Sequence, residues 1–285
     1  MARVALVHPN ERAKWSEAIT WDGLHAALEI VGDKHEVKWF LENERPDDSY
    51  DWIIPWGVGS EPFNNTIEHY SARKALLCAG HPHDTKNFEK FEAIFVESPA
   101  VAKKILHPKV VVAFGTDTQF FKPRSEEKLF DVFFPGTFSP WKRQDLLVEA
   151  AKGLRLLTCG VVQPDGQNLA LQCQNNGYCL QGLVPTRIVA KLYNMSRVVV
   201  IPAWHGSERT ALEAMSSNIP LVIALDNETA CSLAAENVFV ANPDPDSLRE
   251  SIDLALRSDV GTRDHVLNNY SEKIYAEKIL EVIES

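Results

Sequence analysis

Short apolar runs recur along the chain and predict two successive sets of buried strands. The first set covers residues 3–8, 35–41, 51–57, 74–80, 93–98 and 109–115. The second covers residues 129–136, 154–160, 198–204, 220–224 and 237–241. Most of these runs are rich in β-branched or aromatic residues, which is typical of strands buried on both faces.

Segments between these runs carry the spacing of amphipathic helices. In WDGLHAALEIV, residues 21–31, apolar side chains fall at positions 24, 27, 28 and 31. Similar patterns cover residues 143–152, 186–195, 208–217, 246–257 and 271–284. Because strands and helices alternate, we expect an α/β protein with parallel sheets covered by helices, arranged as two doubly wound, Rossmann-like domains.

The boundary between these domains is expected in a polar, proline-containing stretch, GTDTQFFKPRSEEK, residues 115–128. We assign residues 1–118 to the first domain, 119–270 to the second and 271–285 to a final helix. In open parallel sheets, ligands bind at the carboxyl ends of the strands. A crevice between two such domains is therefore the expected binding site.

Composition excludes several classes of protein. With 39 acidic against 29 basic residues, the net charge of −10 disfavours nucleic-acid or anionic-membrane partners. No apolar run reaches the roughly 18 residues that span a bilayer, and no signal-peptide core is visible, so we expect a cytoplasmic protein without a transmembrane segment. The five cysteines show no paired spacing and are expected to be reduced, structural thiols.

The first candidate site follows the predicted strand at 129–136, in PGTFSPWKRQDLLVEA. Lys142 and Arg143 are expected to open a helix there. A helix start exposes N–H groups and the positive end of the dipole, so an added lysine would suit a phosphate. A solvated basic helix start is the alternative.

The second candidate site is AWHGSERTALEAM, residues 203–215. Ser207 is positioned to cap the predicted helix, and Glu208 to interact with its dipole. Glu213 lies in an apolar turn, where a carboxylate is costly to bury unless a group donates to it. A pair of ligand hydroxyls would do so, and a surface glutamate on a helix edge is the alternative.

The third candidate site is CAGHPHDT, where His81, His83 and Asp84 follow the predicted strand at 74–80. A hydrogen-bonding or general-base histidine and an ordinary loop histidine both fit. A metal site is disfavoured because no further ligand has a recognisable spacing. The Asp-Pro-Asp at 244–246 is better explained as a helix cap, so no metal is expected.

Four stretches together resemble the retaining GT-B glycosyltransferases of the group-one, family-four type. They are GTDTQFFKP (115–123), FFPGTFSPWKRQDLLVEA (133–150), QGLVPTRIVAKLYNMSRVVVIPAW (181–204) and ALEAMSSNIPLV (211–222). The resemblance covers most of residues 110–285, and the first 110 residues fit only in outline. It implies a final helix that crosses back to pack on the first domain.

The resemblance implies a transferase that moves a sugar from a nucleotide sugar, UDP- or GDP-linked, to an unknown acceptor. That acceptor would be a sugar, a lipid-linked molecule or another small molecule. Transfer would retain the anomeric configuration and need no metal or other cofactor. Substitutions at two family positions leave open a degraded sugar-nucleotide-binding or scaffold protein. A phosphorylase or epimerase on the same plan has less support, because no motif for either occurs.

The family's phosphate loop is matched by Gly136 and Lys142. Thr137 stands where the family has an arginine, and Arg143 where it has a second glycine. The resemblance implies that Lys142 binds the donor diphosphate and that Arg143 supplies the missing charge.

The family's second glutamate is matched by Glu213, which implies a ribose-binding carboxylate. Eight residues earlier, His205 replaces the glutamate that touches the transferred sugar. Gly206 and Ser207 match the backbone turn along the sugar and phosphate. The remaining donor-side assignments are Glu208 and Thr210 at the helix start, Leu183 and Val184 whose backbone would meet the base, and His81, or alternatively His83, which would reach the donor sugar.

Overall fold

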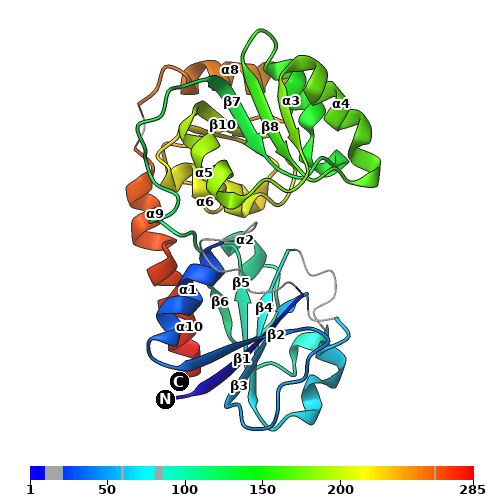
Figure 1. Ribbon diagram of the computed structural model, residues 1–285, viewed down its shortest axis with the longest axis vertical. Helices are drawn as coiled ribbons and strands as arrows, with labels where there is room; N and C mark the ends of the chain where they lie inside the picture. Colours follow the sequence, from blue (N-terminus) through cyan, green and yellow to red (C-terminus); the bar gives the residue numbers. More distant parts are fainter. Residues whose placement is uncertain (10–21, 59–60, 81–85, 260) are drawn as a thin grey trace. The chain divides into compact units, whose positions relative to one another are not determined.

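The computed structural model describes residues 1–9, 22–58, 61–80, 86–259 and 261–285. The chain forms two compact units (Figure 1). Asp22–Gly115 and Ser271–Ser285 belong to the first unit together with the N-terminal strand, and Thr116–Tyr270 belong to the second. Within the described residues, each unit is built on a six-stranded parallel sheet with helices packed on it, so the predicted α/β class is confirmed.

The sheet of the first unit has the strand order β2-β1-β3-β4-β5-β6, and every neighbouring pair is parallel. Its strands are β1 (Arg3–His8), β2 (Glu36–Leu41), β3 (Trp52–Gly57), β4 (Arg73–Cys78), β5 (Ala93–Val96) and β6 (Val110–Val112). Successive side chains of a strand point to opposite faces. In β1, Val4 and Leu6 accordingly enter one hydrophobic core, and Ala5 and Val7 enter the other.

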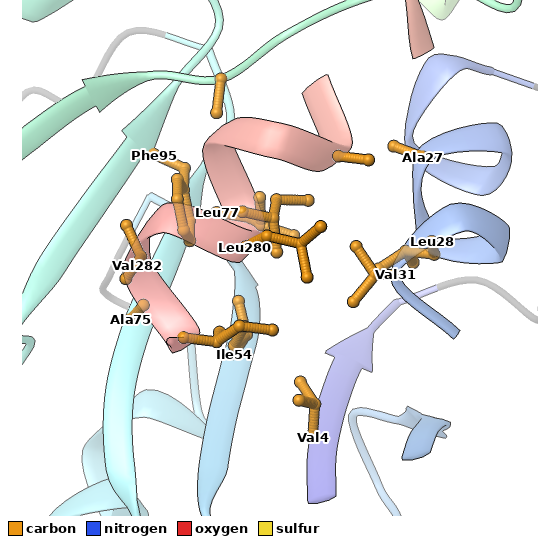
Figure 2. Packing of buried hydrophobic residues seen from close by; sticks show 14 of the residues in the cluster. Val4, Ala27, Leu28, Val31, Ile54, Ala75, Leu77, Phe95, Leu280 and Val282 are labelled. Carbon is orange, nitrogen blue, oxygen red and sulfur yellow. The ribbon is translucent and has the colours of Figure 1, made fainter. Parts of the chain in front are cut away.

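One face of this sheet is covered by α1 (Gly23–Gly32) and α10 (Glu272–Ile283), which lie side by side (Figure 1). Figure 2 shows Leu280 of α10 on the side that faces Leu28 and Val31 of α1, and Val282 on the other side of α10, near Ala75 of β4. The opposite core receives side chains from η1 (Asn64–His69), η2 (Lys86–Phe88), α2 (Pro99–Ala102) and their flanking loops. The end of the chain thus completes the first unit.

Polar contacts stabilise both ends of α10. The Ser271 hydroxyl accepts a hydrogen bond from the Ile274 N–H at 3.4 Å and caps the helix. At the other end, Nε1 of the buried Trp52 donates to the Ile283 carbonyl at 3.2 Å. Since Trp52 belongs to β3, this bond ties the last turn of α10 directly to the sheet.

The sheet of the second unit has the strand order β12-β11-β10-β7-β8-β9, again with parallel pairing. Its strands are β7 (Phe130–Pro135), β8 (Leu156–Gly160), β9 (Tyr178–Gln181), β10 (Ser196–Ile201), β11 (Leu221–Ala224) and β12 (Phe239–Ala241). The chain builds outward from β7 to β9 and then returns to place β10 on the other side of β7. This reversal creates a topological switch point between β7 and β10, where a doubly wound sheet binds its ligand.

The helical elements of the second unit connect these strands. They are η3 (Pro140–Lys142), α3 (Gln144–Ala150), η4 (Pro164–Gly166), α4 (Gln167–Asn176), α5 (Thr186–Asn194), α6 (Glu208–Ser216), α7 (Glu228–Cys231), α8 (Pro245–Ala255) and α9 (Arg263–Asn269). Helix α3 packs with α8 and with α4, which lies beside it in Figure 1. Helix α6 packs with α7 and α9. The switch point lies between the β7–α3 and β10–α6 connections.

The chain passes between the units after Gly115 and again after Tyr270. On the side of the second unit these crossings are joined, because the Thr116 N–H donates to the Tyr270 carbonyl at 2.9 Å. Arg263 also donates from α9 to the Thr118 carbonyl at 2.8 Å. The segment that enters the second unit at Thr116 is therefore hydrogen-bonded to α9 and to Tyr270, where the chain leaves this unit.

The elements not expected from the sequence include one strand, β9, and one full-length helix, α4, besides the shorter helices α2, α7 and α9. Strand β9 reads YCLQ and is mostly exposed, so it lacks the apolar run that marks the other strands. Helix α4 reads QNLALQCQNN and buries only Ala170 and Cys173. Strand β9 is an edge strand of the sheet and α4 packs beside it, so both bury few apolar side chains.

The dependence of the first unit on α10 is testable. Ile279 is buried in the shared core, so Ile279→Ala should lower the free energy of unfolding by about 2–5 kcal/mol through lost packing and the cavity left behind. Urea denaturation would measure this change. Glu277→Ala, on the exposed side of the same helix, is the matched control and should shift stability by about 0.5 kcal/mol or less. Equal midpoints for both variants would contradict the role given to α10.

Candidate functional site

At the switch point, a lysine meets the start of a helix. Lys142, in the loop after β7, donates from Nζ to the hydroxyl of Ser207, in the loop after β10, at 2.7 Å. Ser207 directly precedes α6, whose first turn leaves backbone N–H groups without partners inside the helix. A full positive charge and the positive end of a helix dipole therefore converge at one point.

The backbone beside this lysine is unusually tight. Gly206 has φ +70°, and a Cβ built on it would lie 3.2 Å from the Lys142 Nζ. Ser207 also has a left-handed conformation, with φ 70°, although it carries a side chain. We predicted that the Ser207 side chain caps α6, and this is wrong: its hydroxyl makes no capping bond and instead accepts from Lys142.

Burial at this position changes the acidity of Lys142. Desolvation lowers the pKa of Lys142 from its usual 10.5 to about 8, and the nearby Arg209 acts in the same direction. The Glu208 carboxylate opposes this shift but does not cancel it. A bound anion would therefore stabilise the protonated form of Lys142.

The segment that carries Lys142 differs from the predicted helix start. Pro140–Lys142 form a 3₁₀ turn, Arg143 is left-handed with φ 51°, and α3 begins only at Gln144. The Arg143 guanidinium donates to both carboxylate oxygens of Asp226, at 3.0 and 2.7 Å. The charge of Arg143 is thus paired with the loop after β11, and Lys142 is the cation that reaches Ser207.

The loop after β7 lies against the loop after β8. The Gly136 N–H donates to the Cys159 carbonyl, and the Phe138 N–H to the Val161 carbonyl, both at 2.8 Å. At Gly160, a Cβ would lie 2.1 Å from the Gly136 oxygen, so a side chain there would push the two loops apart. Glycine at position 160 is therefore required by this close approach.

Two buried amides hold the loops in position. Gln144 donates from Nε2 to the Thr137 carbonyl at 2.8 Å, which fixes the loop before α3. Asn227 donates from Nδ2 to the carbonyls of Ala203 and Gly206, both at 2.9 Å. Sequence reasoning missed both residues. Asn227 was detectable as a helix cap before ETAC, but its bonds to the distant loop were not.

His205 lies between two tryptophans. Its ring stacks parallel to that of Trp141, with centroids 6.0 Å apart and an interplanar angle of 7°. The ring of Trp204 meets it edge-on, with centroids 4.4 Å apart. Aromatic rings therefore flank the imidazole of His205.

Glu213 is buried, with 6% of its surface exposed, so the alternative of a surface glutamate is excluded. The Tyr193 hydroxyl, fully buried on α5, donates to Oε2 of Glu213 at 2.9 Å. Burial, with the neighbouring Glu213 charge, raises the pKa of Tyr193 well above its usual value. Nε of Arg209 lies 3.9 Å from the other oxygen, Oε1. The donor that a buried carboxylate requires is thus supplied by the protein.

The remaining candidates are two residues after β9, one threonine at the start of α6 and the segment around the two histidines. Leu183 is exposed and Val184 half-buried in the segment after β9, at the far edge of the sheet. Thr210, in the first turn of α6, donates to the Pro135 carbonyl at 3.3 Å. The assignments to His81, His83 and Asp84 fall outside the described residues, so the structure does not test them.

The remaining sequence predictions concern metals, thiols and membranes. Asp244 caps α8 by accepting the Ser247 N–H at 2.8 Å, which confirms the capping interpretation. All five cysteines lie in the described part of the chain and are free thiols, as expected. Among the described residues, no group of three metal-binding side chains is arranged around a common point. Of the helices described, none combines the length and apolar character needed to cross a bilayer.

Solved glycosyltransferase structures share this fold. Sucrose-phosphate synthase from Thermosynechococcus elongatus is similar with a TM-score of 0.75 at 13% identity, covering 100% of this chain and 98% of that chain. HepE from Anabaena, in complex with UDP and glucose, gives 0.73 at 14% identity over 100% of both chains. AviGT4, a glycosyltransferase involved in avilamycin A biosynthesis, gives 0.65 at 14% identity, covering 100% of this chain and 97% of that chain. No curated protein matches the chain in sequence.

A sequence match identifies the family. Residues 115–274, more than half of the chain, match the family described as glycosyl transferases group 1, and the chain belongs to that family. It is therefore an enzyme that transfers a sugar from a nucleotide sugar to an acceptor. The matched region contains the whole cluster around Lys142, Ser207 and Glu213.

The contact between Tyr193 and Glu213 leads to a prediction about stability. Tyr193→Phe removes only the hydroxyl and leaves a buried carboxylate oxygen without its donor, so the free energy of unfolding should fall by about 1–3 kcal/mol. Urea denaturation would measure the loss. Tyr178→Phe, at an exposed position of β9, is the matched control and should behave like the parent protein. If both variants unfold at the same urea concentration, the bond does not stabilise Glu213.

Proposed function

We propose that this enzyme uses a UDP- or GDP-sugar, retains the anomeric configuration and needs no metal ion. The observation that carries the proposal is the convergence of Lys142, Ser207 and the start of α6 at the switch point. Departure of a nucleoside diphosphate concentrates negative charge on its phosphates. Lys142 and the N–H groups of α6 would stabilise this charge electrostatically.

Lys142 carries most of this role in the proposal. Arg143 is already paired with Asp226, and Thr137 brings no charge to the position of the family's arginine. A lysine can take over part of the charge neutralisation that a divalent cation provides in other transferases. Transfer should therefore persist in the presence of EDTA, and loss of turnover that Mg²⁺ or Mn²⁺ restores would argue against a metal-independent reaction.

Glu213 would bind the ribose hydroxyls. Tyr193 donates to one oxygen of its carboxylate, and each carboxylate oxygen accepts more than one hydrogen bond. The prior contact with Tyr193 would hold the carboxylate in the orientation that ribose needs. Gly206 and Ser207 would lie along the diphosphate because they adjoin Lys142 and directly precede α6.

The lowered pKa of Lys142 predicts that nucleotide binding depends on pH. Without nucleotide in solution, Lys142 loses its proton as pH rises through about 8, whereas a bound diphosphate would favour the charged form. Affinity for UDP or GDP should therefore fall about tenfold between pH 7 and pH 9, because binding must then restore the proton. Isothermal titration calorimetry at both values would measure this fall.

Two variants separate this effect from titration of the nucleotide base. Lys142→Arg stays charged throughout the range, so its affinity should change with pH only as far as the base itself titrates. Lys142→Ala should bind weakly at both values. A wild-type affinity that follows the same pH dependence as the Lys142→Arg protein would refute the assignment of Lys142 to the diphosphate.

Position 205 holds a histidine where the resemblance implies a glutamate in the family, and this difference predicts altered sugar recognition. An imidazole offers one donor and one acceptor, whereas a glutamate offers two acceptor oxygens. His205→Glu should therefore change either the turnover number or the relative rates with different UDP- and GDP-sugars. Rates measured with a panel of such donors would test this. Unchanged rates and preferences would show that His205 does not contact the sugar.

A further inference from the structure

A long segment without charged residues contains helix α4 and strand β9. Residues 166–186 include no Asp, Glu, Lys, Arg or His, although 24% of the residues of the chain are charged. Burial does not account for this composition, because β9 is mostly exposed and α4 buries only Ala170 and Cys173. Depletion of charge on an exposed surface is typical of the centre of a protein interface.

Strand β9 is an edge strand that lacks the usual protection against pairing. Of the four edge strands in the described sheets, β6 and β12 are only three residues long, and β2 exposes Glu36 and Lys38. Short length and exposed charges are two ways in which proteins prevent an edge strand from pairing with another chain. Strand β9 is longer, with four residues, and carries neither a charge nor a proline.

The free edge of β9 offers both backbone and side-chain contacts. The Gly182 N–H donates to the Gly160 carbonyl, on the side of β8, at 2.9 Å. Because backbone groups of successive strand residues point to alternate edges, those of Cys179 and Gln181 point away from β8. Tyr178 and Leu180 lie on one face of the strand, with 68% and 42% of their surfaces exposed.

We propose that β9 pairs with β9 of a second copy of this chain, as antiparallel strands related by a two-fold axis. Antiparallel pairing follows from the symmetry, because a two-fold axis perpendicular to the strands reverses the direction of one of them. In the register that uses both outward-pointing residues, Cys179 lies opposite Gln181 of the partner subunit. Leu180 then lies on the axis, opposite its own copy. The two six-stranded sheets would form one continuous sheet.

The chemistry of this surface fits a second copy better than other partners. Side-chain amides and backbone groups each provide donors and acceptors, so a surface made of them is complementary to itself. No like charges meet there, whereas the net charge of −10 makes two copies repel each other in general. Nucleic acid and anionic membranes need positive charge, which this segment lacks. The exposed amides are Gln167, Asn168, Gln172, Gln174, Asn175, Asn176 and Gln181.

Sedimentation velocity on the full chain tests the proposal. An interface centred on a four-residue strand is small, so the dimer should be weak and concentrations from about 1 to 200 µM should be compared. The wild type should sediment as a monomer of 32.0 kDa at the lowest concentration and increasingly as a dimer above it.

Two lysine substitutions locate the interface. Leu180→Lys places two like charges opposite each other and should raise the dissociation constant of the dimer about tenfold or more. Leu254→Lys makes the same change at a residue of α8 with 50% of its surface exposed, and it should dimerise like the wild type.

Two further variants test the symmetry and the backbone pairing. Leu180→Glu alone should also weaken the dimer, but an equimolar mixture with Leu180→Lys should restore it, because opposite charges then meet on the axis. Gln181→Pro removes an N–H that points away from β8, so it should weaken the dimer while leaving the pairing with β8 in place. Urea denaturation would confirm that each variant is folded.

Three results would overturn the inference. The first is a wild type that stays monomeric throughout the concentration range. The second is a dimer that Leu180→Lys and Leu254→Lys weaken equally. The third is a mixture of the Leu180→Lys and Leu180→Glu proteins that associates no better than either protein alone. None of these results depends on nucleotide binding, so the proposed function is tested separately.

Discussion

The reversal of strand order between β7 and β10 is the constraint on which the rest of this structure depends. All strands of the second sheet are parallel, so every strand delivers its following loop to the same edge. Only between β7 and β10 do the two connections leave in opposite directions, and Lys142 and Ser207 meet there at 2.7 Å. The tight backbone around them follows from this meeting. Gly206, Ser207 and Arg143 all adopt left-handed conformations, and buried amides from α3 and the start of α7 hold the loops against one another.

The electrostatics of the site depend on the burial of Lys142. Desolvation makes the charge of Lys142 expensive, which is why its pKa is near 8, and Glu208 offsets only part of that cost. The neighbouring cation, Arg143, is neutralised by Asp226 and ties two loops together. A desolvated lysine beside a helix start is suited to an anion, because the negative charge of the anion would stabilise the protonated form of Lys142.

The surroundings of this cation divide into a polar side and an aromatic side. On the polar side, Glu213 is buried with Tyr193 as its donor, and it holds its orientation without a ligand. On the aromatic side, Trp204 and His205 present rings rather than carboxylates, and Asn227 fixes the backbone that carries them. Both sides are preorganised by hydrogen bonds from outside the immediate site. Preorganisation of this kind lowers the entropy lost on binding.

Much of this protein was determined by its sequence alone. Buried parallel strands are continuous apolar runs, so most strands of both sheets and helices such as α6 and α10 were predicted close to their observed positions. Strand β9 and helix α4 escaped because their exposed, polar residues carry little periodicity. Lys142 and Glu213 were singled out by residue type and order. Only the tertiary structure decided that Lys142 contacts Ser207, that Glu213 contacts Tyr193 and that Arg143 pairs with Asp226. These residues are 20 to 83 positions apart in the sequence. Contacts over such separations depend on strand order and loop conformation, which local sequence patterns do not encode.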